Sequence, residues 1–303
     1  MRRMPTASDP ATAVDLSRLA APSVVEALSF DAIFAEMLAD LQGRDSAFDG
    51  LVESDPAYKI LEVAAYREML IRQRVNDAAR SVMVAFAKGP DLRHLAAGFG
   101  VQVLVLDPGD PEAGIDPTYE DDEDLRRRIV LAPEGYSVAG PDGAYIFHAL
   151  SASADVLDAS VVSPDPGEVL VTVLARAGDG TADADLLDTV TAALNDKSVR
   201  PITDQVTVQS AEIIEYAIEG QVLTFMGPDA LVVIEQGQAR LTAYVAACRK
   251  LGRDVTLSGI ISALTVEGVQ DVILTDPPAN VVCDRTQAAY CTGIAITHGG
   301  IGE

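Results

Sequence analysis

Residues 156–175 read VLDASVVSPDPGEVLVTVLA, and this stretch has the pattern of a β-hairpin. Two runs rich in valine and leucine, 156–162 and 169–175, flank the turn sequence Pro-Asp-Pro-Gly at 164–167. β-Branched and large apolar residues favour strands, whereas proline, aspartate and glycine favour tight turns. The stretch therefore predicts two adjacent antiparallel strands, and the neighbouring segments have to pack around them.

The hairpin opens a predicted β-β-α-β block at 155–211. A helix is expected at 183–195, where leucines and a valine recur at helical spacing, and a strand at 205–209, where residues alternate. The sequence Gly-Asp-Gly-Thr at 178–181 precedes the helix. It lacks the lysine of a phosphate-binding loop and the ligand count of a calcium loop. We interpret it as a connection in which Thr181 or Asp183 caps the helix.

A second block, at 212–303, has the predicted order β-α-α-β. Its elements are strands at 213–225 and 269–274 and helices at 230–249 and 256–265. Two short strands near 280–283 and 292–297 are expected to follow, and the glycine-rich residues 299–302 are expected to form a tail. We expect both blocks to fold as small α+β sandwiches in series with antiparallel sheets.

On the N-terminal side, residues 56–88 form the strongest predicted helix. Asp55 can cap it, Pro56 suits its first turn, and Gly89-Pro90 would end it. At 1.5 Å per residue the helix would be about 50 Å long, which is more than a small core can cover. Part of it is therefore expected to contact another helix or another chain. Its apolar residues recur at helical spacing: Ile60, Ala64, Ile71, Val75, Ala78, Val82 and Phe86.

The rest of the N-terminal half is predicted to be an extended arm at 1–28 and a helical region at 29–154, in which Ser29 caps a short amphipathic helix. Acidic residues at 120–124 precede three arginines at 126–128, an order that suits a helix dipole. A salt-bridging interface is one interpretation of this charge block. We favour a solvated helix, because exposed ion pairs contribute little. Shorter elements are a helical turn at 92–97, a strand at 101–106, a loop at 107–118 and a helix cap at Thr118.

Composition excludes several classes of function. The chain has 303 residues, of which 22 are Lys or Arg and 46 are Asp or Glu, so its net charge is −24. Nucleic acids and anionic membranes both require a basic footprint, so neither is an expected partner. No apolar stretch is long enough to span a membrane, and three scattered cysteines favour reduced thiols in a cytoplasm. With 49% hydrophobic residues, the chain can bury a sizeable core.

No arrangement of residues typical of catalysis stands out. Neither His94, His148 nor His298 has a second histidine or a cysteine at the spacing of a zinc site, and Ser137 lacks the frame of a nucleophile elbow. His148 is expected to be packed or hydrogen-bonded, and His298 to lie in the tail. We therefore expect no catalytic, cofactor-binding or metal-binding residues and no enzymatic activity. A metal-dependent hydrolase that uses the many carboxylates is the alternative from a different class.

A colinear series of motifs resembles the baseplate J-like family of contractile phage tails. The series covers roughly residues 22–298, in order and without a large gap. The most specific motif is EGYSVAGP at 134–141, followed by GAY at 143–145 and Phe147-His148. The other motifs are AYRE at 65–68, RQRVNDAAR at 72–80, EDLR at 123–126, GDGT at 178–181, VRP at 199–201, VTVQS at 206–210, LGRD at 251–254 and VEGVQ at 266–270.

The resemblance implies a structural baseplate wedge subunit of the virion tail, assembled in the cytoplasm of the bacterial host. In such a family two copies join a helical wedge partner protein through a helical bundle. The wedges then contact neighbouring wedges, the hub and sheath-proximal proteins, and close into a ring that links the hub to sheath and fibres. A ring needs two different complementary surfaces on each unit, which serial α+β modules can supply. The equivalent subunit of a tailocin or of an extracellular contractile injection system is an alternative within the same class.

The long helix is the expected assembly interface, because it outreaches its own core and matches the segment that forms the bundle in this family. Its aromatic and arginine side chains are of the types common at interface hot spots. The alternative is that the helix only crosses the back of its own domain. The expected interface residues are Ile60, Tyr66, Arg67, Ile71, Arg72, Arg74, Val75 and Val82.

Overall fold

The structure, a computed structural model, describes residue 16 and residues 19–20, 22–137, 139–227 and 229–302, and it confirms the predicted α+β class. The chain divides into two compact units. The helical unit contains the described residues of 14–102 and 122–126, and the α+β unit contains those of 103–121 and 127–302. Most of the predicted arm at 1–28, namely residues 1–15, 17, 18 and 21, lies outside the described residues.

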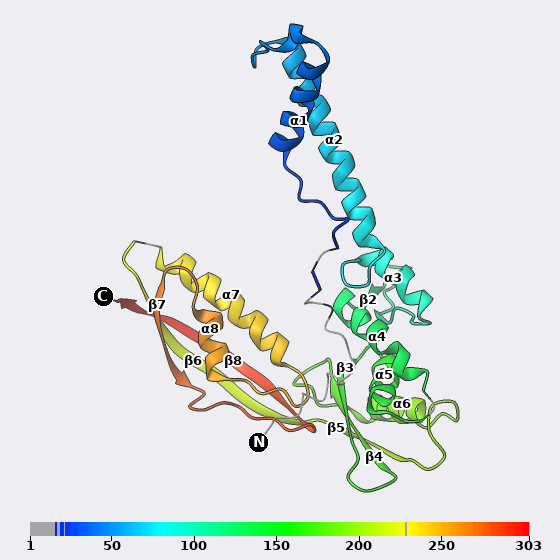
Figure 1. The fold of residues 1–303 in the computed structure, drawn as a ribbon. Coiled ribbons are helices and arrows are strands. Elements are labelled where there is room, and N and C mark those ends of the chain that lie inside the picture. Colours follow the sequence, from blue (N-terminus) through cyan, green and yellow to red (C-terminus); the bar gives the residue numbers. More distant parts are fainter. Residues whose placement is uncertain (1–15, 17–18, 21, 138, 228, 303) are drawn as a thin grey trace. The chain divides into compact units, whose positions relative to one another are not determined.

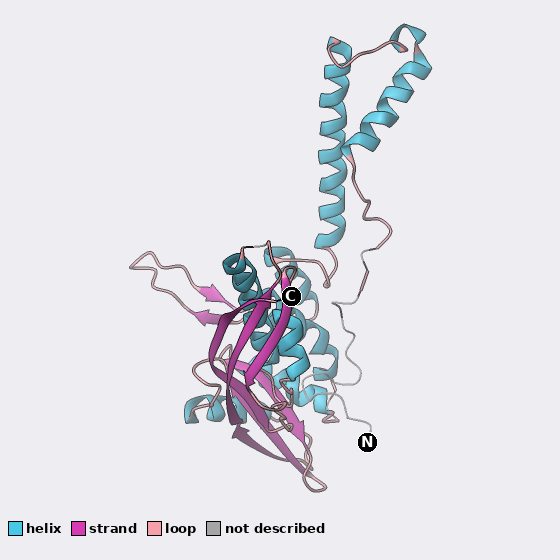
Figure 2. Ribbon diagram, turned by 90° about the vertical axis from the view of Figure 1, so that its left-hand side faces the viewer, coloured by secondary structure: helices cyan, strands magenta, loops and turns pink. Residues whose placement is uncertain are grey.

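The helical unit is built on a helical hairpin of α1 (Phe30–Arg44) and α2 (Pro56–Ser81), as Figures 1 and 2 show. The short helix η2 (Ser46–Phe48) lies in the connection, and α3 (Gly89–Gly98) follows α2. Ser29 caps α1 as predicted, because its hydroxyl accepts a hydrogen bond from the Ala32 N–H. Asp55 precedes α2, but its carboxylate accepts from the Val52 N–H and fixes the preceding turn.

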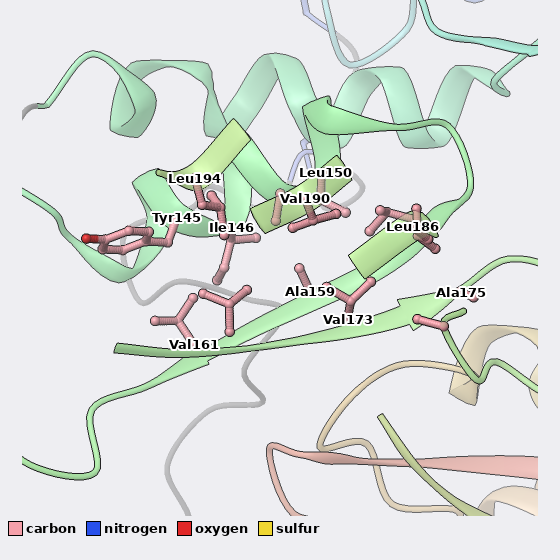
Figure 3. Close-up of a cluster of buried hydrophobic side chains, with 14 of the residues drawn as sticks. Tyr145, Ile146, Leu150, Ala159, Val161, Val173, Ala175, Leu186, Val190 and Leu194 are labelled. Carbon is pink, nitrogen blue, oxygen red and sulfur yellow. The ribbon is translucent and has the colours of Figure 1, made fainter. Parts of the chain in front are cut away.

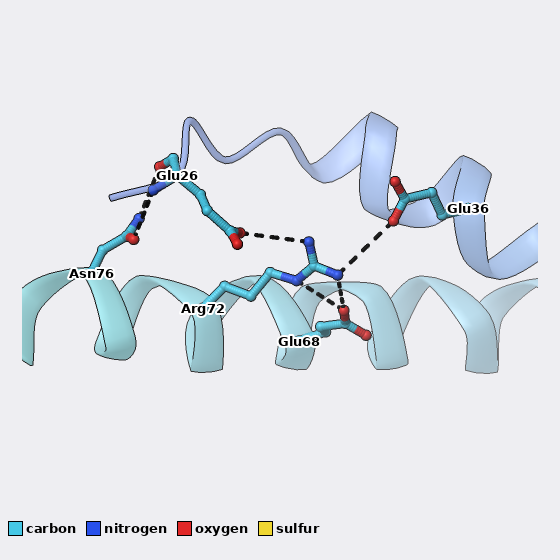
Figure 4. Close-up of polar contacts among 5 residues, drawn as sticks. All are labelled: Glu26, Glu36, Glu68, Arg72 and Asn76. Carbon is cyan, nitrogen blue, oxygen red and sulfur yellow. Dashed lines mark hydrogen bonds and ion pairs between the residues drawn. The ribbon is translucent and has the colours of Figure 1, made fainter. Parts of the chain in front are cut away.

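The two helices of the hairpin share only a small apolar core. Ile33 is the buried residue of α1, and Ala65 and Asn76 are those of α2. Phe34 packs against Tyr58 with tilted rings whose centroids are 4.8 Å apart. The Asn76 side chain both accepts from the N–H of Glu26 at 3.0 Å and donates to its carbonyl at 2.9 Å (Figure 4). One face of α2 is thus occupied by α1 and by the segment that precedes it.

The long helix ends earlier than predicted, at Ser81 rather than at residue 88. Residues 82–87 form turns in which Phe86 and Ala87 donate to the Met83 carbonyl. The carbonyls of Val84 and Ala87 accept from the guanidinium of Arg126, each at 2.8 Å. These hydrogen bonds replace the ones that a continued helix would make, so a residue about 40 positions away decides where α2 stops.

The first sheet of the α+β unit contains β3 (Val156–Val162), β4 (Glu168–Ala175) and β5 (Gln205–Ser210), in the order β3-β4-β5. Helices α5 (Asp142–Ala152) and α6 (Ala184–Leu194) contribute to its core. Figure 3 shows Ala159, Val161 and Val173 of the sheet facing these helices. Asp183 caps α6 through the Leu186 N–H, so the Gly-Asp-Gly-Thr sequence lies in a strand-to-helix connection, as predicted.

The second sheet contains β6 (Glu212–Thr224), β7 (Val269–Asp276) and β8 (Gln287–Ile301), in the order β7-β6-β8. Helices α7 (Ala230–Cys248) and α8 (Leu257–Leu264) share its core. Both helices have side-chain caps, Asp229 for α7 and Thr256 for α8.

The prediction that both sheets are antiparallel is wrong. Each sheet has one antiparallel pair, β3/β4 or β6/β7, and one parallel pair, β4/β5 or β6/β8. A two-residue to five-residue turn can only reverse the chain, but a longer connection can return it in the same direction. The connection through α6 returns β5 parallel to β4. In the second sheet β7 runs antiparallel to β6, and the irregular segment after β7 reverses the chain again, so β8 runs parallel to β6.

The C-terminal segment is one long strand rather than two short strands and a tail. β8 pairs with β6 from Gln287 to Ile301, and His298, expected in the tail, lies in this strand within 3.1 Å of the Thr224 hydroxyl. Val281 makes only an isolated bridge with Val255. Glycines are depleted in strands, which is why residues 299–302 resemble a tail in sequence. The backbone ladder with β6 outweighs that preference.

The interpretation of the charge block as a solvated helix is also wrong. β1 (Val105–Asp107) and β2 (Thr118–Tyr119) precede α4 (Asp122–Gly135), so Thr118 lies in a strand and does not cap the helix. Within the α+β unit, Arg128 pairs with Glu120 at 2.5 Å, and the two side chains are 6% and 2% exposed. The Glu120 carboxylate also accepts from the Leu104 N–H at 2.8 Å. Successive helical residues point about 100° apart, so neighbouring arginines reach different buried partners.

The half-buried histidine of α5 gives a testable pH dependence. His148 lies on α5, and burial lowers its pKa, while a hydrogen bond with the Gly135 backbone opposes that shift. The unfolded chain therefore binds a proton more readily than the folded chain. Stability should be highest above the unfolded pKa of about 6.5 and should decline as the pH falls below it.

We expect His148→Gln to flatten this decline between pH 7.5 and 5.5, measured as the melting temperature of the α+β unit within the intact chain. His94→Gln is the matched control, because His94 is exposed on α3. The control should keep the wild-type pH dependence. A His148 variant with the same slope as wild type would contradict the assignment.

Candidate assembly interface

An apolar stripe follows the exposed side of α2 in the helical unit. Its side chains are between 41% and 70% exposed, although all are large and aliphatic. Single exposed apolar residues are normal, but a contiguous set on one helix marks an interaction surface. We call this set the α2 stripe: Ile60, Val63, Leu70, Ile71 and Val75 of α2, and Val82, its C-cap residue.

Helical geometry places the α2 stripe away from α1. At 100° per residue, Ile60, Ile71 and Val82 fall within about 40° of one another around the helix axis. The buried residues Ala65 and Asn76 fall roughly 100–160° away from them, on the side that faces α1. The hairpin therefore uses one side of α2 for its own packing and leaves the opposite side available.

The stripe contains four of the eight predicted interface residues. Ile60, Ile71, Val75 and Val82 belong to it, and the exposed Arg67 and Arg74 lie on the same side of the helix. Tyr66 is half exposed at the edge of the stripe. These residues combine aliphatic area with two guanidinium groups, a composition that fits a partner surface with apolar and acidic side chains.

Arg72, another of the predicted interface residues, lies on the side of α2 that faces α1. Its guanidinium forms an ion pair with Glu68 at 2.5 Å and lies 3.7 Å from Glu26 and 3.9 Å from Glu36 (Figure 4). The hydrogen bond with Glu68 and the nearby carboxylates raise the pKa of Arg72 above its ordinary value. Arg72 thus joins α2 to α1 and to the segment before it.

Sequence reasoning missed two members of the stripe, and it also missed Asn76, which joins α2 to the segment before α1. Val63 and Leu70 are exposed on α2, and their spacing of three from Ile60 and from Arg67 was the available signal. Asn76 gave no comparable signal. Its role depends on the Glu26 peptide, which is 50 residues away in the sequence.

The described residues give little support for a metal site, a membrane-spanning helix or a reactive cysteine. Across the parts of the chain that the structure describes, no group of three or more His, Cys, Asp or Glu side chains is arranged to hold a metal ion. None of the helices within those parts is long and apolar enough to cross a membrane. Burial raises the pKa of the Cys283 thiol to about 11, which disfavours the reactive thiolate.

The chain thus combines a helical hairpin that bears an exposed apolar stripe with two mixed sheets covered by helices. Family comparisons agree along the chain. Residues 53–110 match the Baseplate J-like N-terminal domain, 137–210 the Baseplate J-like central domain and 216–297 the Baseplate J-like protein C-terminal domain. The chain is also 45% identical over 300 residues to baseplate protein J of Escherichia phage P2, covering 96% of this chain and 99% of that protein. The chain therefore belongs to the baseplate J-like family.

Family membership confirms the resemblance that the motifs indicated and gives the chain a structural role in a phage tail baseplate. The family is one of structural proteins rather than of enzymes. Among solved structures, a chain of the sixfold-symmetrised cryo-electron microscopy structure of the anti-feeding prophage baseplate is similar, with a TM-score of 0.40 and 14% identity. That similarity covers 58% of this chain and 43% of the other.

Proposed function

We propose that this chain is a wedge subunit of the baseplate of a contractile phage tail. In this role it joins a second copy of itself and a helical partner protein, and the resulting wedges close into a ring around the tail hub. The ring links the hub to the sheath and fibres. Family membership supports the baseplate role, and the exposed α2 stripe is the observation that carries the wedge assignment.

The α2 stripe fits a helix better than it fits a flat surface. Large aliphatic side chains at spacings of three, four and seven are the anchors by which one helix packs against another. Leu70, Ile71 and Val75 lie near the middle of α2, where a partner helix would bury them most completely. Arg67 and Arg74 flank them and would pair with acidic residues of that helix.

We further propose that assembly takes place in the cytoplasm of the bacterial host and that the role involves no catalytic turnover. The four-part division into 1–28, 29–154, 155–211 and 212–303 is likewise our proposal for how the chain is organised. A hydrolase activity that copurifies with the chain and disappears after one point substitution would contradict the non-catalytic role.

The direct test is to locate the chain in assembled particles. A prophage that lacks this gene is complemented with a chain carrying a small C-terminal tag, and purified tails are reconstructed with and without a tag-binding antibody fragment. The proposal expects extra density on a ring around the hub, and tail assembly should stop without complementation. Density elsewhere on the tail, or intact baseplates without the chain, would contradict it.

A further inference from the structure

Asp158 of β3 is a fully buried carboxylate that the assembly role does not use. It is 0% exposed and lies within the α+β unit, where its neighbours in the strand, Ala159 and Val161, face the helices of the first core (Figure 3). One carboxylate oxygen, Oδ1, accepts from the guanidinium of Arg127 on α4 at 2.5 Å. The other, Oδ2, accepts from the N–H of Leu251 at 2.9 Å. Asp158 therefore contacts two separate elements at once.

Leu251 lies at the junction of the two sheets. It is 0% exposed and packs in a small cluster with Leu174 of the first sheet and Ala288 of the second. Its neighbour Arg249 donates from one guanidinium nitrogen to the carbonyls of Arg176 and Gly178 in the first module. Residues 249–252, which we call the junction segment, follow α7 and thus attach the second module to the first.

The Gly-Asp-Gly-Thr connection forms the other half of this junction. Gly180 has φ +110°, and a Cβ there would lie 2.5 Å from a methyl group of Leu174. Leu174 belongs to the same cluster as Leu251, so the turn needs glycine to approach the junction closely. The carbonyl of Gly178, in the same turn, accepts from Arg249 at 2.7 Å. The Gly-Asp-Gly-Thr turn and the junction segment are thus in contact with each other.

The buried carboxylate makes the junction depend on α4. A buried charge is tolerated when it is paired, and removing one partner of such a pair strongly destabilises the other. Arg127, whose side chain is 19% exposed, supplies the positive charge that balances Asp158. The hydrogen bond to Leu251 is therefore made by a carboxylate whose burial is possible because α4 is in place.

We propose that Asp158 couples the position of α4 to the closure of the junction between the two sheets. When Arg127 pairs with Asp158, the carboxylate stays buried and holds the Leu251 N–H. When Arg127 withdraws, the unbalanced charge favours exposure to water, and the junction segment loosens. Coupling of this kind is reciprocal, so opening of the junction also weakens the hold on α4.

Hydrogen–deuterium exchange of the junction segment in the full chain tests this coupling. Arg127→Met removes the cation but keeps an apolar stem. It should speed exchange of the peptide covering 249–253 by about tenfold or more, because local opening follows the loss of a buried ion pair. Arg253→Gln is the matched control, since it removes a positive charge from an exposed side chain two residues from Leu251. The control should leave exchange unchanged.

A double-mutant cycle separates coupling through the charge from a general loss of packing. Asp158→Asn removes the charge and keeps an oxygen that can accept from Leu251. In that background Arg127→Met should have little effect on exchange at 249–253. Arg127→Lys in the wild-type background should retain most of the protection. Equal acceleration by Arg127→Met in both backgrounds, or no acceleration in the wild-type background, would overturn the proposal.

Discussion

Replacing Val75 by aspartate is expected to abolish incorporation of the chain into baseplates while the free chain stays folded. Val75 is 54% exposed on the side of α2 that faces away from α1. An aspartate there remains solvated in the free chain and changes its stability little. In a helical bundle the same carboxylate would be buried without a partner, which costs several kcal/mol of association free energy, on the order of 3–5.

The experiment compares the thermal melt of the purified variant with its yield in assembled wedges or tails. Val52→Asp is the matched control, because Val52 is 55% exposed in the same unit but lies outside α2. The control introduces the same side chain at a similarly exposed position and should assemble normally. A Val75 variant that unfolds, or one that assembles like wild type, would count against the α2 stripe as the interface.

The second large effect is expected from Arg128→Met in the α+β unit. Arg128 neutralises Glu120, whose side chain is 2% exposed and also accepts from the Leu104 N–H. Removing the cation leaves a buried carboxylate without this countercharge. The free energy of unfolding should fall by about 3–5 kcal/mol. Denaturant unfolding of the purified chain, followed as a shift of the midpoint at constant slope, measures the loss.

Two variants show whether burial of the pair causes the effect. Glu120→Gln combined with Arg128→Met removes both charges, and glutamine can still accept from Leu104, so the double variant should recover most of the stability. Arg44→Met breaks the ion pair between Arg44 and Asp40, whose side chains are 74% and 65% exposed. Because this pair is solvated, its loss should change the free energy of unfolding by less than about 1 kcal/mol. Equal losses for Arg128→Met and Arg44→Met would refute the buried-pair explanation.

Local sequence chemistry was sufficient to predict most elements of the fold. The hairpin at 156–175 appears as β3 and β4, and the helix expected at 230–249 appears as α7, Ala230–Cys248. Strand propensity, turn residues and helix caps act over a few positions, so they can be recognised without knowing the fold. The helical spacing of Ile60, Ile71, Val75 and Val82 was predictable for the same reason, because it is a property of one helix, whereas Val63 and Leu70 were missed.

Contacts between distant residues decided what the sequence pattern left open. The same alternation of side chains suits a parallel or an antiparallel partner, so β5 and β8 could not be paired from sequence. The end of α2 at Ser81 depends on Arg126, and the inward position of Arg72 depends on carboxylates at 26 and 36. Each of these outcomes requires a partner that the local pattern does not contain.

The charge block at 120–128 shows most clearly which features the local sequence predicted and which features the tertiary structure decided. From the sequence, the acidic residues and arginines at 120–128 predicted a helix, and acidic residues do occupy the first turn of α4, although its last turn contains no basic residue. Whether those charges faced water or each other was decided by the tertiary structure. Burial places Glu120 beside Arg128 and Asp158 beside Arg127, and in a low-dielectric interior pairing then becomes obligatory. Local sequence determined most of the helices and strands and the helical spacing of the apolar residues on α2, while the packing of distant segments decided which side of α2 is exposed, which charges are paired and which strands are neighbours.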